Sequence, residues 1–94
     1  LVVTGEGRID FQSALGKVPV GVASRAKKIR NVPVIAIAGA KGEGCETLYS
    51  FGIDAIFDTV PGVMPLEDVM RQAEENLEKT TENVFRLFQL GRSR

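Results

Sequence analysis

The chain has 94 residues, of which 44% are hydrophobic and 26% charged, a composition typical of a folded globular domain rather than a disordered segment. Twelve basic residues balance twelve acidic ones, which argues against a nucleic-acid-binding module. The absence of histidine argues against a zinc site or a Ser-His-Asp system. The single cysteine excludes an internal disulfide and fits a reducing compartment, so we expect a cytoplasmic protein. No apolar run reaches the roughly 18–20 residues of a membrane span, so we expect no membrane partner.

The balanced charge is unevenly distributed along the chain. Residues 1–41 hold seven basic and two acidic residues, whereas residues 42–94 hold five basic and ten acidic ones. A basic first half suits an anionic ligand such as a phosphate. The alternative is that four of the basic residues simply decorate the end of one helix: Arg25, Lys27, Lys28 and Arg30.

Three short apolar runs predict buried strands at Leu1–Thr4, Val32–Ala38 and Ile53–Thr59. Each is rich in Val, Ile or Ala and is followed by glycine or proline. Near-continuous apolar runs are typical of parallel strands that are covered on both faces. The chain opens directly on the first run, so we expect it to be a segment of a longer protein.

Helical periodicity separates these runs. It predicts a helix over Val18–Ile29, a shorter one over Gly44–Phe51 with Gly52 as its cap, and one long helix from Leu66 to about Leu90. The alternation predicts a three-layer α/β fold with a parallel sheet, part of a larger Rossmann-like or flavodoxin-like domain. Ligands of such sheets bind beyond the carboxyl ends of the strands.

The segment after the first predicted strand holds the residues best suited to chemistry. Gly5 and Gly7 let the backbone approach a ligand, and their N–H groups can form an anion site. Arg8 can bind a carboxylate or phosphate through two hydrogen bonds. Asp10 could accept a proton from a hydroxyl, hold Mg²⁺ or anchor a hydroxyl. Lys17 leads into a helix whose N-terminus attracts anions.

A structural interpretation of the same segment stays open. Gly5 to Gly7 could form a plain turn, and Arg8 and Asp10 could form a structural ion pair. The segment is not the dinucleotide fingerprint, because the next glycine is Gly16, and it is not a Walker A loop, because no Gly-Lys-Ser/Thr follows at the required spacing.

Two further loops follow predicted strands. The loop Gly39–Gly44 contains three glycines and Lys41, and it could reach a phosphate, with Gly39 as the candidate contact; a flexible connection is the alternative. The loop Pro61–Pro65 turns the chain into the long helix, and we expect it to be structural. Cys45 is expected to be a small buried residue rather than a nucleophile.

Residues 3–19, VTGEGRIDFQSALGKVP, resemble the signature near the C-terminal end of bacterial glycerate kinases, which are two-domain α/β enzymes. The similarity continues through residues 21–23, 32–36, 39 and 52–57 and ends at residues 82–84. Chains of that family are several times longer. The resemblance therefore implies that residues 1–94 are the C-terminal fragment of a glycerate kinase α/β domain.

The resemblance implies transfer of the γ-phosphate of ATP to a hydroxyl of D-glycerate with Mg²⁺, and 2-phosphoglycerate is the favoured product. In that reaction we expect Arg8 and Asp10 to be catalytic, with Asp10 also a candidate Mg²⁺ ligand. The candidate substrate- or phosphate-binding residues are Gly5, Glu6, Gly7, Lys17 and Gly39.

The cleft of such enzymes lies between two domains, so we expect this chain alone to be inactive. Its partners would be glycerate, ATP and the remainder of the parent chain or a homo-oligomer. Two other functions stay open. One is a phosphate- or nucleotide-binding module that lacks a base, and the other is an interaction domain that docks through its long helix.

Overall fold

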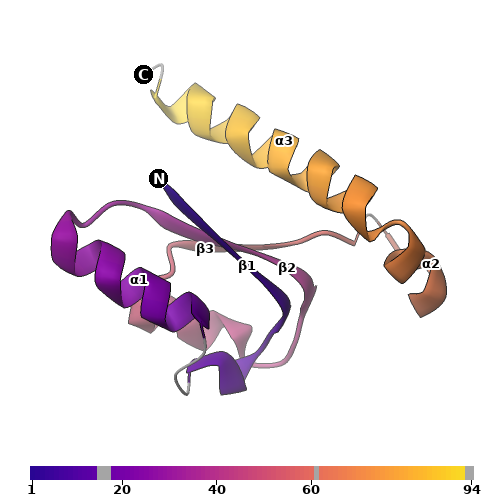
Figure 1. Ribbon diagram of the computed structural model, residues 1–94, viewed down its shortest axis with the longest axis horizontal. Helices are drawn as coiled ribbons and strands as arrows, with labels where there is room; N and C mark the ends of the chain where they lie inside the picture. The colour runs from indigo at the N-terminus through magenta and orange to yellow at the C-terminus, as the bar shows by residue number, and fades with distance from the viewer. Residues whose placement is uncertain (15–17, 61, 93–94) are drawn as a thin grey trace. The chain divides into compact units, whose positions relative to one another are not determined.

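The computed structural model describes residues 1–14, 18–60 and 62–92. The chain divides into two compact units, Leu1–Asp58 and Thr59–Arg94. The first unit holds the sheet and the second holds two helices (Figure 1). The expected loop Pro61–Pro65 begins on a residue outside the described ranges.

The first unit contains one sheet of three parallel strands with β2 in the middle. Val2 of the first strand lies opposite Val34 of the central one. The parallel sheet and the α/β class that the alternating pattern predicted are confirmed, and the sheet is compatible with a part of a larger domain. The strands are β1 (Val2–Ile9), β2 (Val34–Lys41) and β3 (Ala55–Asp58).

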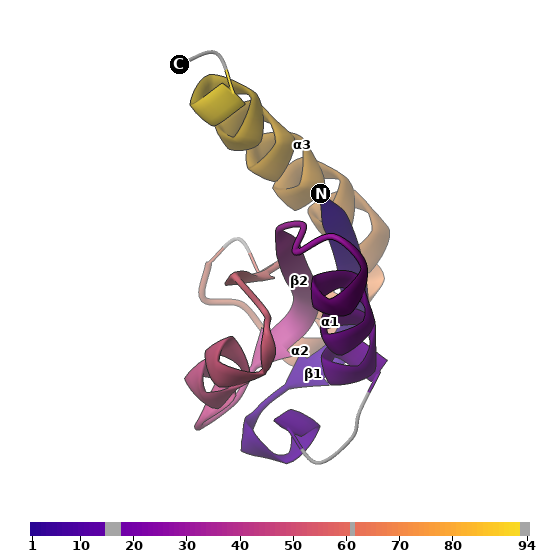
Figure 2. The ribbon, with the colours of Figure 1, turned by 90° about the vertical axis from the view of Figure 1, so that its left-hand side faces the viewer.

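Two helical segments cover one face of this sheet. The helix α1 (Val18–Ile29) joins β1 to β2, and the 3-10 helix η2 (Cys45–Phe51) joins β2 to β3. They contact each other, and Figure 2 gives a side view of the sheet and α1. Their buried side chains share a single apolar core with the strands, which consists of Ile9, Ala23, Val34, Ala36, Ala38, Leu48, Ile53 and Ile56.

The central strand is apolar on both faces. Val34 and Ala36 belong to the core under the helices. Because side chains alternate along a strand, Ile35 and Ile37 point to the opposite face. The near-continuous apolar run of β2 therefore has the pattern of a parallel strand that is covered on both sides.

The first strand is longer than its apolar run predicted. The prediction ended it at Thr4 and placed Gly5 in a loop, whereas β1 continues to Ile9. At this end Gly7 and Gly39 lie side by side, and a Cβ on Gly39 would come within 2.8 Å of the Gly7 carbonyl oxygen. Glycine thus allows the two backbones to pair closely here. The prediction was wrong because backbone pairing with β2 continues through Glu6 and Arg8, which carry no apolar signal.

The boundaries of the other strands also shift. β2 begins at Val34, after Pro33, whose nitrogen cannot donate a hydrogen bond, and it runs on to Lys41. β3 covers only Ala55–Asp58 of the expected run. Ile53 is buried in the core, but its N–H bonds to the Leu48 carbonyl oxygen, so it belongs to the turn that leaves η2.

Glycines bound the second helical segment on both sides. Gly44 (φ 77°) and Gly52 (φ 99°) both adopt the left-handed conformation that favours glycine. The Gly52 N–H bonds to the carbonyl oxygens of Leu48 and Tyr49, which confirms the predicted cap. The segment is a 3-10 helix rather than the predicted α-helix.

The second unit contains two helices where one long helix was predicted. α2 (Leu66–Arg71) and α3 (Ala73–Arg92) are interrupted at Gln72, which has φ −100° and ψ 12°. No glycine or proline marks this position, so the continuous apolar spacing concealed the break. Two acid-first ion pairs lie along α3, Glu75–Lys79 at 2.9 Å and Glu82–Arg86 at 3.0 Å.

Candidate functional site

The carboxyl end of β1 brings an arginine and an aspartate together. Arg8 Nε donates a hydrogen bond to Asp10 Oδ2 at 3.2 Å. Arg8 lies in the strand and Asp10 directly follows its last residue, Ile9, so the two side chains are close in the chain. The pair borders a hollow of about 300 Å³, and four of the predicted site residues contribute to it. Its lining consists of Glu6, Gly7, Arg8, Asp10, Gln12 and Ser13.

Asp10 is held in place by the short 3-10 helix η1 (Phe11–Ala14) that follows it. Its Oδ1 accepts the Gln12 N–H at 2.9 Å, and its own N–H donates to Ser13 Oγ at 3.3 Å. The Ser13 N–H in turn donates to the Asp10 carbonyl oxygen at 3.0 Å. This aspartate therefore caps a helix with one oxygen and directs the other toward Arg8.

The exposure of the two side chains differs. The Arg8 side chain is 64% exposed, whereas that of Asp10 is 20% exposed. Within the described part of the chain, only Nε of Arg8 is engaged, which leaves the two Nη groups available to an anion. The arrangement can bind a carboxylate or a phosphate in two-pronged fashion beside a fixed carboxylate.

Gly5 and Gly7 lie within the strand rather than in a loop. Val2 donates its N–H to the Pro33 carbonyl oxygen at 2.8 Å, toward β2. Since alternate residues of a parallel strand direct their N–H groups to the same neighbour, those of Gly5 and Gly7 point to the other edge of β1. There the Gly7 N–H donates to its neighbour Glu6 Oε1 at 3.3 Å. The two glycines thus present a strand edge and not the expected turn.

The other predicted contacts fall in two places. Gly39 lies in β2 against Gly7, where close backbone packing accounts for a glycine. Lys17 lies outside the described residues. The phosphate contact of Gly39 stays a prediction, and so does that of Lys17.

The loop after β2 is fastened to the end of β1. The Gly42 N–H donates to the Ile9 carbonyl oxygen at 2.7 Å, and the Phe11 N–H donates to the Glu43 carbonyl oxygen at 3.1 Å. The second glycine-rich loop is therefore part of the framework of the site. Sequence reasoning assigned no role to Gly42 or to Ser13. The three-residue spacing of Asp10 and Ser13 is a capping pattern, and it could have indicated the role of Ser13.

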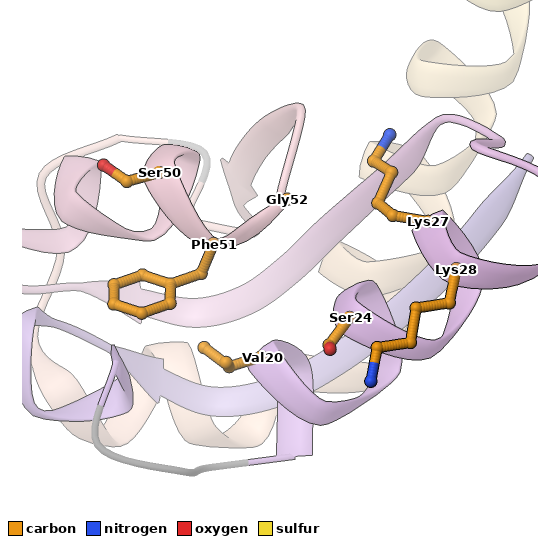
Figure 3. A pocket seen from close by; sticks show the side chains of 7 residues that line it. All are labelled: Val20, Ser24, Lys27, Lys28, Ser50, Phe51 and Gly52. Atoms are coloured by element: carbon orange, nitrogen blue, oxygen red, sulfur yellow. The ribbon is translucent and has the colours of Figure 1, made fainter.

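A larger groove of about 500 Å³ lies between α1 and η2 and shares no residue with the Arg8–Asp10 hollow. One of its two lysines, Lys27, donates to Asp54 Oδ2 at 2.7 Å and to the Val32 carbonyl oxygen at 2.8 Å. Lys27 and Lys28 extend in different directions from α1 (Figure 3). Lys27 is thus bound within the fold, whereas Lys28, the second cation that lines the groove, is exposed. It is lined by Val20, Ser24, Lys27, Lys28, Ser50, Phe51 and Gly52.

A metal ion would find few protein ligands here. Across residues 1–14, 18–60 and 62–92, no three carboxylate, thiol or imidazole side chains gather closely enough to hold one. Glu6 and Asp10 are the carboxylates of the hollow. In the same ranges, no helix is long and apolar enough to span a membrane.

Comparison with known proteins identifies the wider context of this site. The model of the glycerate kinase family matches residues 1–89. The chain is 51% identical over 83 residues to a glycerate kinase of Halalkalibacterium halodurans, covering 88% of this chain and 22% of the relative. It is 46% identical over 93 residues to the glycerate kinase of Bacillus subtilis (99% and 24%) and 42% identical over 91 residues to the glycerate 2-kinase of Escherichia coli (97% and 24%). The chain thus spans about a quarter of the length of these relatives, and it belongs to the glycerate kinase family.

Proposed function

We propose that this chain supplies part of the active site of a cytoplasmic, ATP-dependent glycerate kinase. That enzyme would transfer the γ-phosphate of ATP to a hydroxyl of D-glycerate, with Mg²⁺, and release 2-phosphoglycerate. The name of the Escherichia coli relative, glycerate 2-kinase, supports this choice of product. The observation that carries the proposal is the Arg8–Asp10 pair beside a hollow, at the strand end where α/β sheets bind ligands.

Arg8 is proposed to bind the carboxylate of glycerate or a transferring phosphate. Its side chain is 64% exposed, and its guanidinium is oriented by Asp10 through Nε alone. The remaining donors form the planar fork that suits either anion. Because phosphoryl transfer depends mainly on positioning and charge neutralisation, an arginine held in this way is a suitable catalytic group.

Asp10 is proposed to act on the substrate hydroxyl, either as the base that accepts its proton or through a bound Mg²⁺. Mg²⁺ is commonly held by one or two carboxylates together with substrate phosphates and water, and Glu6 and Asp10, which line the hollow, are the carboxylates proposed for this role. The ion would neutralise charge on the phosphates of ATP. Asp10 would hold its carboxylate at a fixed position, because the Gln12 N–H donates to that carboxylate and the Asp10 N–H donates to Ser13 Oγ.

The test is a chimera in which this chain replaces the matching segment of the Bacillus subtilis enzyme, to which it aligns over 93 residues. The chimera should phosphorylate D-glycerate with ATP, lose activity when the divalent cation is chelated, and yield 2-phosphoglycerate by phosphorus NMR. A folded chimera without glycerate kinase activity would refute the proposal. The isolated chain should be inactive, because the remainder of the enzyme supplies the other wall of the cleft.

A second function has one observation in its favour. Both oxygens of Asp10 already accept hydrogen bonds, from Gln12 and from Arg8, as expected if this carboxylate is purely structural. The segment would then bind a phosphate or nucleotide without a base. Asp10→Asn in the chimera separates the two functions: lost turnover with retained binding favours catalysis, and unchanged turnover favours the binding role.

A further inference from the structure

Gly42 is fixed beside the end of β1. It follows the last residue of β2, and its N–H donates to the Ile9 carbonyl oxygen at 2.7 Å. Its own carbonyl oxygen accepts the Cys45 N–H at 3.2 Å. The backbone at this position is therefore bonded on both sides and cannot move away freely.

The space above Gly42 is occupied by the Arg8–Asp10 pair. A Cβ at position 42 would lie 2.6 Å from Arg8 Nη2 and 2.8 Å from Asp10 Cβ. Both distances are shorter than real Cβ contacts, so a neighbouring group would have to move. The end of the arginine can swing away, but Asp10 Cβ is held by the cap that Asp10 forms on η1. A side chain at this position would thus displace the guanidinium first.

Conformation does not explain the glycine. Gly44, two residues later, has a φ of 77°, in the left-handed region, whereas the φ of Gly42 lies outside that region. The φ of Gly42 therefore does not require glycine. What the position provides is the absence of a side chain beneath Arg8.

We propose that Gly42 is a positioning residue for anion binding by Arg8. Because Gly42 has no side chain, the guanidinium can pack directly against its backbone. In this position Asp10 accepts the hydrogen bond from Nε, and the Nη groups face an anionic substrate, a carboxylate or a phosphate. This inference rests on the proposed kinase function. It links the second glycine-rich loop to the site through steric fit instead of direct phosphate contact.

The first experiment compares Gly42→Ala with Gly21→Ala in the chimera with the Bacillus subtilis enzyme. A Cβ on Gly21 would meet nothing within 4 Å, so this variant is a matched control. Gly42→Ala should raise the KM for the substrate that Arg8 binds by about 10- to 100-fold, as a displacement of about 1 Å can do, with a smaller change in kcat. Gly21→Ala should leave both constants unchanged. Unaltered KM values for both substrates in Gly42→Ala would overturn the proposal.

The second experiment asks whether the effect passes through Arg8. In an Arg8→Ala background, Gly42→Ala should add no further rise in KM, because the displaced group is already gone. An equal further rise would show that Gly42 acts independently of Arg8 and would overturn the proposal. If Gly42→Ala alone does not fold, a double variant that folds would show that the conflict lies with the arginine, as proposed. A double variant that also fails would place the conflict with Asp10 and would overturn the proposal. An inactive but folded unmodified chimera would refute the kinase function itself, and with it this role.

Discussion

Lys27 on α1 and Asp54, the residue before β3, form an ion pair of 2.7 Å. The same Asp54 oxygen accepts the Val34 N–H at 2.7 Å, and Lys27 Nζ also reaches the Val32 carbonyl oxygen at 2.8 Å. One carboxylate and one ammonium thereby join the crossover helix to the starts of β2 and β3.

Asp54→Ala should destabilise the fold. The loss leaves the N–H of the buried Val34 without its acceptor, which costs about 1–3 kcal/mol of unfolding free energy. Urea denaturation of the chimera measures it. Glu75→Gln is the control, because the side chains of the Glu75–Lys79 pair on α3 are both exposed and their ion pair should contribute less to stability. Equal effects of the two substitutions would contradict the role given to Asp54.

Acid should remove this contribution. The hydrogen bond from Lys27, followed by that from the Val34 N–H, lowers the pKa of Asp54 below its ordinary value of 3.8. A carboxylate whose pKa is lower in the folded than in the unfolded state stabilises the fold above the unfolded pKa and loses that effect as the pH falls through the folded pKa.

The free-energy difference between the chimera and its Asp54→Asn variant should therefore be constant between about pH 5 and pH 7 and shrink below the ordinary value of 3.8. Denaturation across this pH range measures it. A difference that grows as the pH falls would show that the pKa is shifted in the opposite direction. Because the Asp54 side chain is 48% exposed, solvent screening keeps the charge-dependent part small.

The sequence was sufficient for the framework of the fold. Apolar runs indicated the parallel strands, and helical spacing placed α1 at Val18–Ile29, as observed. The cap at Gly52 followed from glycine's tolerance of the left-handed region. These features depend on local residue chemistry and on periodicity, which a single sequence displays directly.

Other features depend on contacts that periodicity does not reveal. The continuation of β1 through Gly5 and Gly7 arises from pairing with β2, so no apolar signal accompanies it. The space that Gly42 leaves under Arg8 exists only because two loops distant in sequence meet. The pairing of Arg8 with Asp10, by contrast, could be predicted from the sequence, because both residues lie within one short segment. What the sequence left open was whether that pair is structural or functional.

Arg8→Ala in the chimera should weaken binding of one anionic substrate. A lost hydrogen bond to a charged group costs about 1.5–3 kcal/mol, which corresponds to a rise of about 10- to 150-fold in KM. Arg8→Lys should recover only part of this, because an ammonium lacks the planar fork. Steady-state kinetics with glycerate and ATP varied separately identify which anion is bound. The control is Arg25→Ala, which removes an exposed cation that lies on α1, and it should change neither KM. Unchanged kinetics in Arg8→Ala would refute the assignment of Arg8 to the site.

Asp10→Asn should separate the chemical role of this side chain from its structural one. Asparagine keeps an oxygen that can accept the Gln12 N–H, so the cap on η1 and the stability of the chimera should be preserved. The negative charge and the basicity are lost, and turnover should fall by about 10²–10⁴-fold if Asp10 is the base. Asp10→Ala removes the cap as well, and it should cost about 1 kcal/mol of stability in addition. Rapid-quench measurement of phosphoglycerate formation in a single turnover reports the chemical step. A normal single-turnover rate in Asp10→Asn, with Asp10→Ala merely less stable, would show that Asp10 serves the fold alone.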